Sequence, residues 1–310
     1  MNKIISKEQF SEKVFKLEIE APLIAKSRRA GHFVIVRVDE KGERMPLTIA
    51  GSNLEKGTIT LVVQTVGLSS TKLCNLNEGD YVLDVVGPLG QATHIQNYGT
   101  VVCAGGGVGV APMLPIIQAL KAAGNRVISV LAGRSKELII LEEEVRASSD
   151  EVIIMTDDGS YGTKGLVTEG IESVIKREKV DKCFAIGPAI MMKFCCLLTK
   201  KYEIPTDVSL NTIMVDGTGM CGACRITVGG KTKFVCVDGP EFDGHQVDFD
   251  EMFKRMGSFK DVEREEMSHL EQHVCKVEPQ AEAKKSECKP CSEKACQMPM
   301  EELLDRKAPW

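Results

Sequence analysis

Hydrophobic and polar residues alternate along the first third of the chain with the period of two that a β-strand requires. Turn sequences around Gly42, Gly57 and Gly79 separate the alternating runs at the short intervals typical of antiparallel strands. The runs are Val14–Glu20, Phe33–Val38, Thr58–Gln64 and Tyr81–Val86. This pattern predicts a small antiparallel β-barrel over residues 1–97.

From residue 98 the pattern changes to short apolar runs that alternate with segments of helical period. The predicted strands are Gly99–Ala104, Arg126–Ala132, Glu151–Met155 and Lys182–Ile186. The predicted helices are Met113–Ala123, Lys136–Ala147, Leu166–Glu178 and a last helix that Gly187 opens. This order predicts a parallel sheet with helices on its faces over residues 98–206. Such sheets bind ligands at the carboxyl ends of their strands.

Two shorter regions follow the predicted sheet. Residues 207–256 hold a glycine- and cysteine-rich run and predict a small separate module. Residues 257–310 change to a Glu- and Lys-rich composition that ends near Met298 in a candidate docking helix. This tail carries four cysteines, which could hold a second metal or belong to a plain linker. They are Cys275, Cys288, Cys291 and Cys296.

Composition restricts the classes of function. The chain of 310 residues has a net charge of −5 and no basic block, which argues against nucleic acid as a partner. Its first ten residues lack the apolar segment of a signal peptide. Its longest apolar run, Val101–Ile117, is interrupted by glycine and proline, so we expect a cytoplasmic protein without a membrane span.

Twelve cysteines in a chain without a secretory signal favour metal or cluster ligation over disulfides. Five of them lie within apolar segments and are expected to be small buried residues. These are Cys74, Cys103, Cys183, Cys195 and Cys196.

Three other cysteines form a ligand-like run together with one carboxylate. Asp216, Cys221, Cys224 and Cys236 have the spacing Asp-x4-Cys-x2-Cys-x11-Cys. Plant-type [2Fe–2S] proteins use Cys-x4-Cys-x2-Cys and a distant fourth cysteine, so one thiolate is exchanged here for a carboxylate. The other interpretation of Asp216 is a plain Asp-Gly turn beside a missing or three-ligand cluster.

Four polar or glycine-rich motifs lie where ligands bind in barrels and parallel sheets. Arg44–Ala50 places a guanidinium, a proline and a hydroxyl on one extended strand, and Gly67–Leu73 precedes a short helix. Gly105–Pro112 joins a strand to a helix but lacks the last glycine of the dinucleotide fingerprint. Thr156–Gly165 follows the third predicted strand. Each motif alone is also compatible with an ordinary turn or helix cap.

Taken in this order, the motifs resemble the ferredoxin–NADP+ reductase superfamily over residues 1–256. Within it, the chain is similar to dihydroorotate dehydrogenase electron-transfer subunits. It is more similar to the small (alpha) subunits of NADH-dependent reduced ferredoxin:NADP+ oxidoreductase, also called sulfide dehydrogenase beta subunits. The resemblance implies a flavin-binding barrel, a nucleotide-binding domain and a [2Fe–2S] module. In the second branch a carboxylate replaces the first cluster cysteine, as Asp216 does here.

The resemblance also implies a set of cofactor contacts. Arg44 would lie near the FAD pyrophosphate, and Thr48, near flavin N5, would be the catalytic residue. The implied FAD contacts are Arg44, Pro46, Leu47, Thr48, Val62, Gln64, Gly67, Ser70 and Thr71. Those of the nicotinamide nucleotide are Gly107, Gly109, Ala111, Pro112, Asp157, Asp158, Gly159, Gly187, Pro188 and Met191. Asp216, Cys221, Cys224 and Cys236 would ligate the cluster.

The resemblance implies an electron-transfer subunit of a heteromeric NAD(P)H-linked oxidoreductase, and an electron-bifurcating complex is one form that this enzyme would take. A larger flavin and iron–sulfur subunit would be its partner, with ferredoxin reached through the complex. The choice between NAD(H) and NADP(H) stays open. Other hypotheses are the electron-transfer subunit of dihydroorotate dehydrogenase, an adaptor without turnover, a stand-alone diaphorase, and a relative that has lost its cofactors.

Overall fold

The structure is a computed structural model and describes residues 1–268. The tail cysteines Cys275, Cys288, Cys291 and Cys296 and the predicted helix near Met298 lie outside the described residues. Within the described part, residues 1–263 form one compact unit.

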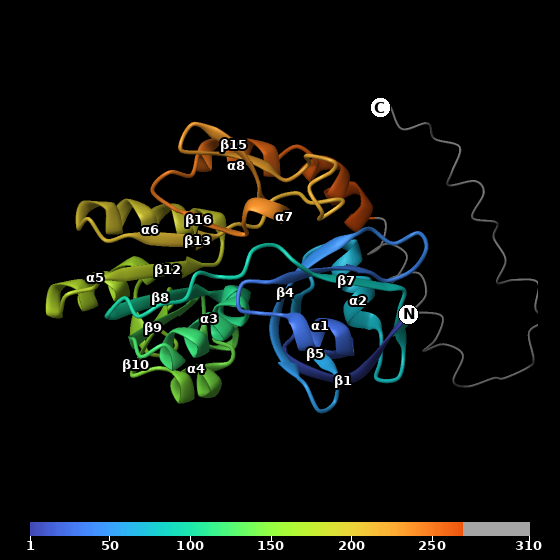
Figure 1. Cartoon of the computed structure of the whole chain (residues 1–310), viewed down its shortest axis with the longest axis horizontal. Helices are drawn as coiled ribbons and strands as arrows, with labels where there is room; N and C mark the ends of the chain where they lie inside the picture. Colours follow the sequence, from blue (N-terminus) through green and yellow to red (C-terminus); the bar gives the residue numbers. More distant parts are fainter. Residues whose placement is uncertain (269–310) are drawn as a thin grey trace, which may run out of the picture. The chain divides into compact units, whose positions relative to one another are not determined.

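Seven antiparallel strands follow one another in the order β6-β1-β2-β5-β4-β3-β7. They form a nearly closed barrel (Figure 1). The strands are β1 (Asn2–Ser11), β2 (Val14–Glu20), β3 (Phe33–Arg37), β4 (Met45–Asn53), β5 (Thr58–Gln64), β6 (Tyr81–Val82) and β7 (Asp84–Leu89). Two short helices, α1 (Pro22–Ser27) and α2 (Leu68–Asn75), join strands. The predicted barrel is thus confirmed, although β1 was not predicted and the run Tyr81–Val86 is divided between β6 and β7.

A second sheet of seven strands has the order β11-β10-β9-β8-β12-β13-β16. Its parallel strands are β8 (Thr100–Gly106), β9 (Arg126–Gly133), β10 (Glu151–Thr156), β11 (Thr163–Lys164), β12 (Lys182–Ile186) and β13 (Thr206–Ser209). The helical segments that join them are η1 (Gly107–Gly109), α3 (Val110–Ala122), η2 (Lys136–Leu138), α4 (Glu142–Ser148), α5 (Val167–Arg177) and α6 (Ala189–Lys201). The predicted parallel sheet is therefore confirmed.

Helices cover both faces of this sheet. Val101 and Cys103 of β8 pack with α3 and α4, whereas Val102 and Ala104 pack with α5 and α6. Burial on both faces explains why the strands appear in the sequence as continuous apolar runs rather than alternating ones.

The predicted helix Lys136–Ala147 is wrong in its middle. The structure has the short turn η2 and then α4, and Leu141 between them has a left-handed φ of 55°. Ile140 and Leu141 are buried in the core beneath α3, so tertiary packing interrupts the helical pattern.

The C-terminal module consists of the hairpin β14 (Arg225–Val228) and β15 (Lys231–Phe234), helix α7 (Val235–Asp238), strand β16 (Glu241–Asp243) and helix α8 (Phe249–Met256). Strand β16 pairs antiparallel with β13 and so extends the large sheet. Strand β13 itself straddles the predicted domain boundary at residue 206. The module and one face of the sheet share a single core, which includes Cys224 and Cys236.

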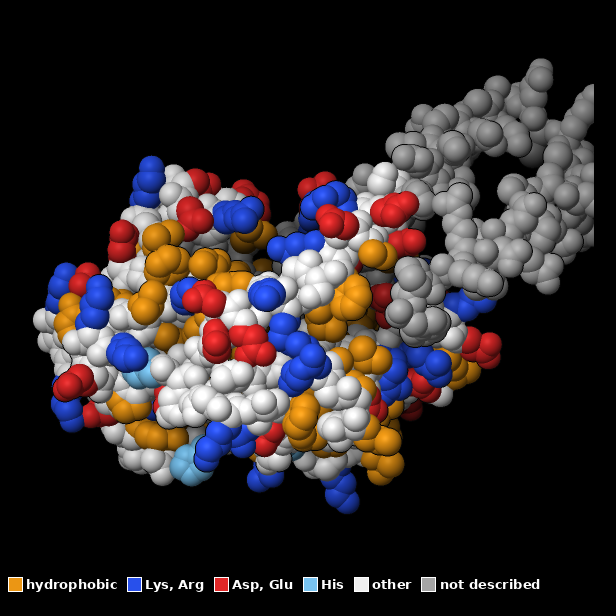
Figure 2. Space-filling model, turned by 90° about the horizontal axis from the view of Figure 1, so that it is seen from above, with side chains coloured by type: hydrophobic (Ala, Val, Ile, Leu, Met, Phe, Trp, Pro, Cys, Tyr) orange, Lys and Arg blue, Asp and Glu red, His pale blue; other side chains and the backbone are white. Residues whose placement is uncertain are grey.

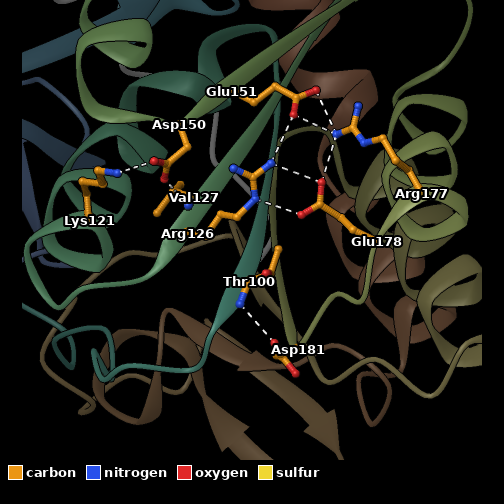
Figure 3. A network of polar contacts seen from close by, with 9 residues as sticks. All are labelled: Thr100, Lys121, Arg126, Val127, Asp150, Glu151, Arg177, Glu178 and Asp181. Atoms are coloured by element: carbon orange, nitrogen blue, oxygen red, sulfur yellow. Dashed lines mark hydrogen bonds and ion pairs between the residues drawn. The ribbon is translucent and has the colours of Figure 1, made fainter.

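Ion pairs and hydrogen bonds of charged side chains connect the amino-terminal ends of the strands of the large sheet (Figure 3). Arg126 pairs with Glu178 at 2.8 Å and Arg177 with Glu151 at 2.8 Å. The Asp181 carboxylate accepts the N–H of Thr100 at 3.0 Å. These contacts lie at the edge opposite to the carboxyl ends, so they hold the strands without occupying the ligand edge.

On the face that Figure 2 shows, acidic and basic side chains are interspersed, with apolar patches between them. Among the residues that the structure describes, no helix has the length and apolar character needed to cross a membrane.

Candidate functional site

The outer face of the barrel carries the strand predicted to lie along the flavin. Leu47 of β4 packs against the barrel core, so Pro46 and Thr48 on either side of it face outward. Phe33 and Ile35 of β3 pair directly with Thr48 and Pro46. Their side chains belong to the core that the module shares with the large sheet. The predicted flavin strand therefore lies beside the strand that carries the module.

The loop before α2 is organised by one hydroxyl. Ser70 Oγ accepts the N–H groups of Val66 and Gly67, both at 3.0 Å, and donates to the Gly67 carbonyl at 2.9 Å. The N–H of Thr71 donates to the same carbonyl at 3.0 Å. Ser70 thus shapes this predicted phosphate loop, and a phosphate would meet the remaining N–H groups of the first helical turn.

The α2 loop lies beside the start of β4. Ser69 Oγ donates to a Glu43 carboxylate oxygen at 2.5 Å. Arg44, which follows Glu43 in the chain, donates from Nε to the Val215 carbonyl at 3.0 Å and from Nη2 to the Asp216 carbonyl at 3.1 Å. Its predicted contact with the FAD pyrophosphate stays a prediction, since these two bonds go to the cluster loop.

Val62 and Gln64 lie on β5, next to β4 in the barrel. The Val62 side chain is buried in the core beneath α3, which also contains Ala111. This packing brings the predicted flavin strands against the predicted nucleotide loop. Gln64 is partly buried at the end of β5, where it pairs with Val14.

Two loops meet at the carboxyl ends of β8 and β12. A Cβ atom on Gly109 would lie 2.5 Å from the Ile186 carbonyl oxygen and 2.7 Å from Gly187 Cα, so only glycine allows this approach. Gly107 has a left-handed φ of 54°, and no atom lies within 4 Å of the position that a Cβ would take. These features form a close glycine-lined surface of the kind that lets a phosphate or nicotinamide reach the backbone.

Methionine and proline complete the same edge. A Cβ atom on Gly187 would lie 2.8 Å from Met191 Cε, and one on Gly106 would lie 3.2 Å from Pro188 Cδ. Pro112 occupies the first turn of α3, where a helix needs no donor. Gly107, Gly109, Gly187, Pro188 and Met191, predicted from separate motifs, are therefore neighbours.

The remaining predicted nucleotide residues follow β10. The N–H groups of Asp157 and Asp158 donate to the carbonyls of Gly133 and Arg134 at 3.1 and 3.2 Å. Hydrogen bonds from Ser160 lower the pKa of Asp158. Gly159 beside it has a φ of 79°. The two loops after β9 and β10 are thus joined at the ligand edge.

Two of the three cysteines of the cluster run are in contact. Cys224 Sγ and Cys236 Sγ are 3.3 Å apart, and both residues are buried. Burial, followed by the neighbouring Cys224 thiol, raises the pKa of Cys236 to about 12. Cys221 is exposed, and backbone N–H groups, that of Ala223 first, lower its pKa. A bound cation would favour the thiolate of Cys236, because metal ligation requires the deprotonated thiol.

Within residues 1–268, no three His, Cys, Asp or Glu side chains converge on one point as the ligands of a mononuclear site would. A [2Fe–2S] cluster has four protein ligands for two irons and therefore takes its ligands in pairs. Cys224 with Cys236 fits one iron. Asp216 and Cys221 are the predicted pair for the other iron, from their place in the ligand spacing. The donor set is thus compatible with the predicted cluster.

Three donors converge on one oxygen of Asp216. Its Oδ2 accepts the N–H of Thr218 at 2.8 Å, the Thr218 hydroxyl at 2.5 Å and the N–H of Met220 at 3.2 Å. The Thr218 hydroxyl, then these N–H groups and the Arg44 charge, lower the pKa of Asp216. Ligating carboxylates are commonly oriented in this way, with the other oxygen left for the metal. The same bonds also describe an Asp-Gly turn, so ligation by Asp216 stays a prediction.

The sequence does not predict that Phe33 and Ile35 of β3 form the surface on which the module packs. The alternation in Phe33–Val38 predicts two faces for β3 but does not say which face meets the module. A second missed group lies where β16 meets the barrel: Glu241 Oε1 and Thr93 Oγ1 are buried next to Gly31 without hydrogen-bond partners. No motif in the sequence connects these three positions.

A cleft of about 540 Å³ lies elsewhere, at the amino ends of β12 and β13. Its lining includes Lys182, Asp207 and His245, and Lys182 pairs with Asp207 at 2.8 Å. Because parallel sheets bind ligands at the opposite edge, this cleft is not part of the predicted site.

A family model and two relatives of this chain name dihydroorotate dehydrogenase B. Residues 211–248 match the model of the iron-sulfur cluster binding domain of dihydroorotate dehydrogenase B. The dihydroorotate dehydrogenase B (NAD(+)) electron transfer subunit homolog of Thermotoga maritima is 49% identical over 264 residues, which cover 85% of this chain and 93% of that protein. The electron transfer subunit of Desulforamulus reducens is 31% identical over 253 residues, with coverages of 79% and 96%.

A solved structure also matches most of the chain. It is that of an NADH-dependent reduced ferredoxin-NADP oxidoreductase studied for flavin-based electron bifurcation. The TM-score is 0.84 at 47% identity, over 87% of this chain and 98% of that one.

Proposed function

The chain belongs to the family of dihydroorotate dehydrogenase B electron transfer subunits, and from this membership we propose that it is the FAD- and [2Fe–2S]-containing electron-transfer subunit of a heteromeric NAD(P)H-linked oxidoreductase. We assign FAD to residues 1–97, the nicotinamide nucleotide to residues 98–206 and the cluster to residues 207–256.

One observation carries this proposal. Pro46 and Thr48, on the predicted flavin strand, are the direct partners of Ile35 and Phe33, which pack against the cluster module. Adjacent strands lie about 4.8 Å apart, so a flavin on β4 would be close to the cluster loop. On the other side, Val62 packs in one core with Ala111 of the nucleotide loop. A flavin on this face would therefore lie between the two other sites.

When bound, FAD can take a hydride from a nicotinamide and release its electrons one at a time to an iron–sulfur cluster. The chain's own residues act by binding and positioning. Thr48 presents a hydroxyl on the outer face, where it would donate to or accept from flavin N5. The glycine-lined surface of Gly107 and Gly109 admits a nucleotide close to the backbone. Asp216, Cys221, Cys224 and Cys236 would hold the cluster.

The partner in this proposal is a larger subunit that carries a second flavin and further clusters. It is supported by the resemblance to a bifurcating NADH-dependent ferredoxin-NADP oxidoreductase. Ferredoxin would be reached through that complex. A second candidate is an electron-transfer subunit of dihydroorotate dehydrogenase, which the names of two relatives favour. Asp216 favours the first candidate, because the dihydroorotate branch is expected to have a cysteine there.

The test is a visible spectrum followed by turnover. The purified chain should show a flavin band near ~450 nm with cluster absorption at longer wavelength. NADH should bleach the flavin band, and a dye acceptor should sustain oxidation if the chain turns over alone. A colourless protein with no iron or flavin after reconstitution would refute the proposal. Oxidation of dihydroorotate by the complex purified with its partner would select the second candidate.

A further inference from the structure

The loop that holds the predicted cluster is attached to the barrel at two points. The first is Arg44, which precedes β4. Its Nε donates to the carbonyl of Val215 at 3.0 Å and its Nη2 to the carbonyl of Asp216 at 3.1 Å. One planar guanidinium thus binds two successive carbonyls of a loop that lies more than 170 residues further along the chain.

The second point is Gly217, the next residue of the loop. It has a φ of 83°, and a Cβ atom there would lie 2.7 Å from Ile35 Cγ1 and 3.2 Å from Leu89 Cδ1. The loop backbone therefore rests directly on two barrel strands. Ile35 is fully buried beneath it. A side chain at position 217 would lift the loop away from this surface.

Both points adjoin the predicted flavin strand. Arg44 is followed by β4 itself, and Ile35 is the direct partner of Pro46 on β4. Three consecutive residues, Val215, Asp216 and Gly217, are thereby fixed against the outer face of the barrel. These contacts tie Asp216 to that face.

We propose that Arg44 and Gly217 form a docking contact that seats the cluster loop on the flavin barrel, and that Arg44 is a positioning residue for electron transfer between flavin and cluster. The inference rests on the proposed function. Lysine cannot replace Arg44 fully, because a single ammonium does not span two carbonyls in fixed directions. The carbonyls would be left without their charged donor in an Arg44→Gln variant.

The predicted role of Arg44 at the FAD pyrophosphate is the competing explanation for any effect of its mutation. Gly217 separates the two. Its contacts are with Ile35 and Leu89, so a Gly217→Ala variant would displace the loop without removing a phosphate ligand. Arg37→Gln is the matched control, because Arg37 is a barrel arginine whose guanidinium pairs with Asp84.

The first experiment is hydrogen–deuterium exchange of the full chain as purified. Amide exchange in residues 214–222 should accelerate roughly tenfold in Arg44→Gln, the factor expected for loss of about one charge-assisted hydrogen bond. It should also accelerate in Gly217→Ala, because the added methyl group would lift the loop from Ile35. Arg37→Gln should exchange like the unaltered chain in this segment. Unchanged exchange in both test variants would overturn the docking contact. This measurement needs neither cofactor, so it remains decisive if the proposed function fails.

The second experiment follows the loaded chain after rapid mixing with NADH. Flavin bleaching and the spectral change of the cluster are recorded in one trace, with FAD and iron contents measured beforehand. Both variants should slow the cluster phase relative to the flavin phase by about tenfold. FAD loss in Arg44→Gln together with normal kinetics in Gly217→Ala would overturn the positioning role and assign Arg44 to the pyrophosphate. A chain that binds neither cofactor would refute the proposed function instead.

Discussion

Ile35 and Pro46 are direct partners across β3 and β4, and their side chains lie on the same outer face of the barrel. Ile35 packs beneath Gly217 of the cluster loop, whereas Pro46 lies on the strand assigned to the flavin. A single strand pair thus connects the two proposed redox sites. The pairing of β3 with β4 therefore sets the separation of the two proposed sites.

Asp216→Ala should lose or destabilise the cluster while FAD stays bound. The variant removes one of four proposed ligands and leaves the barrel surface unchanged. Iron content and the visible spectrum of the reconstituted chain measure the effect. An Asp216→Cys variant restores a fourth thiolate and should retain the cluster. A cluster spectrum unchanged in Asp216→Ala would show that the carboxylate only shapes its turn.

Thr48→Ala should slow flavin reduction by NADH about tenfold, which corresponds to one lost hydrogen bond of about 1.4 kcal/mol in the transition state. FAD content should remain the same, because the flanking residues still provide the strand. Thr48→Ser keeps the hydroxyl and should retain most of the rate. The flavin reduction phase after rapid mixing is the readout, and equal rates in all three proteins would exclude a role for the hydroxyl.

Gly109→Ala should strongly weaken the reduction of the flavin by NADH, but FAD and the cluster should stay bound. Its new methyl group would collide with the Ile186 carbonyl at 2.5 Å and push the glycine loop away from β12. Titration with NADH, monitored by flavin bleaching, gives the loss of affinity. Gly257→Ala is the control, because a Cβ there meets its nearest atom at 3.4 Å and φ is −77°. Normal bleaching in Gly109→Ala would argue against this loop as the nucleotide site.

The hydrophobic pattern predicts an element well where burial of one face determines the sequence. Val14–Glu20 and Thr58–Gln64 alternate over most of their length and are found as β2 and β5 with the predicted ends. The helix predicted over Lys136–Ala147 is wrong because Leu141 has a left-handed conformation and a buried side chain. The helical pattern of the sequence does not reveal this. Strand β1 was overlooked, and its register is irregular at two places.

The candidate site was predictable as motifs but not as an assembly. The spacing of Cys221, Cys224 and Cys236 identifies a ligand set, since thiolate spacing is a local property. The seat of the loop on Ile35 and the bonds from Arg44 depend on contacts between segments far apart in sequence. Only the folded chain brings them together.

The carboxylate oxygen Oε1 of Glu241 is buried beside Gly31 and Thr93, although the residue as a whole is partly exposed. Burial raises the pKa of Glu241 to about 7 from its ordinary value of 4.5. The folded chain therefore holds this proton more tightly than the unfolded chain. Its stabilising contribution is complete below pH 4.5 and is lost progressively as the pH rises through about 7.

Glu241→Gln removes this titration and should make stability less dependent on pH between about 4.5 and 7. At pH 8 the variant should be the more stable protein, by at most about 3 kcal/mol, and at pH 4.5 the two should be nearly equal. Thermal unfolding midpoints of both proteins across this range measure the difference, with the exposed Glu143→Gln as control. If Glu241→Gln changes the unfolding midpoint by the same amount at every pH, then Glu241 keeps its charge in the folded chain.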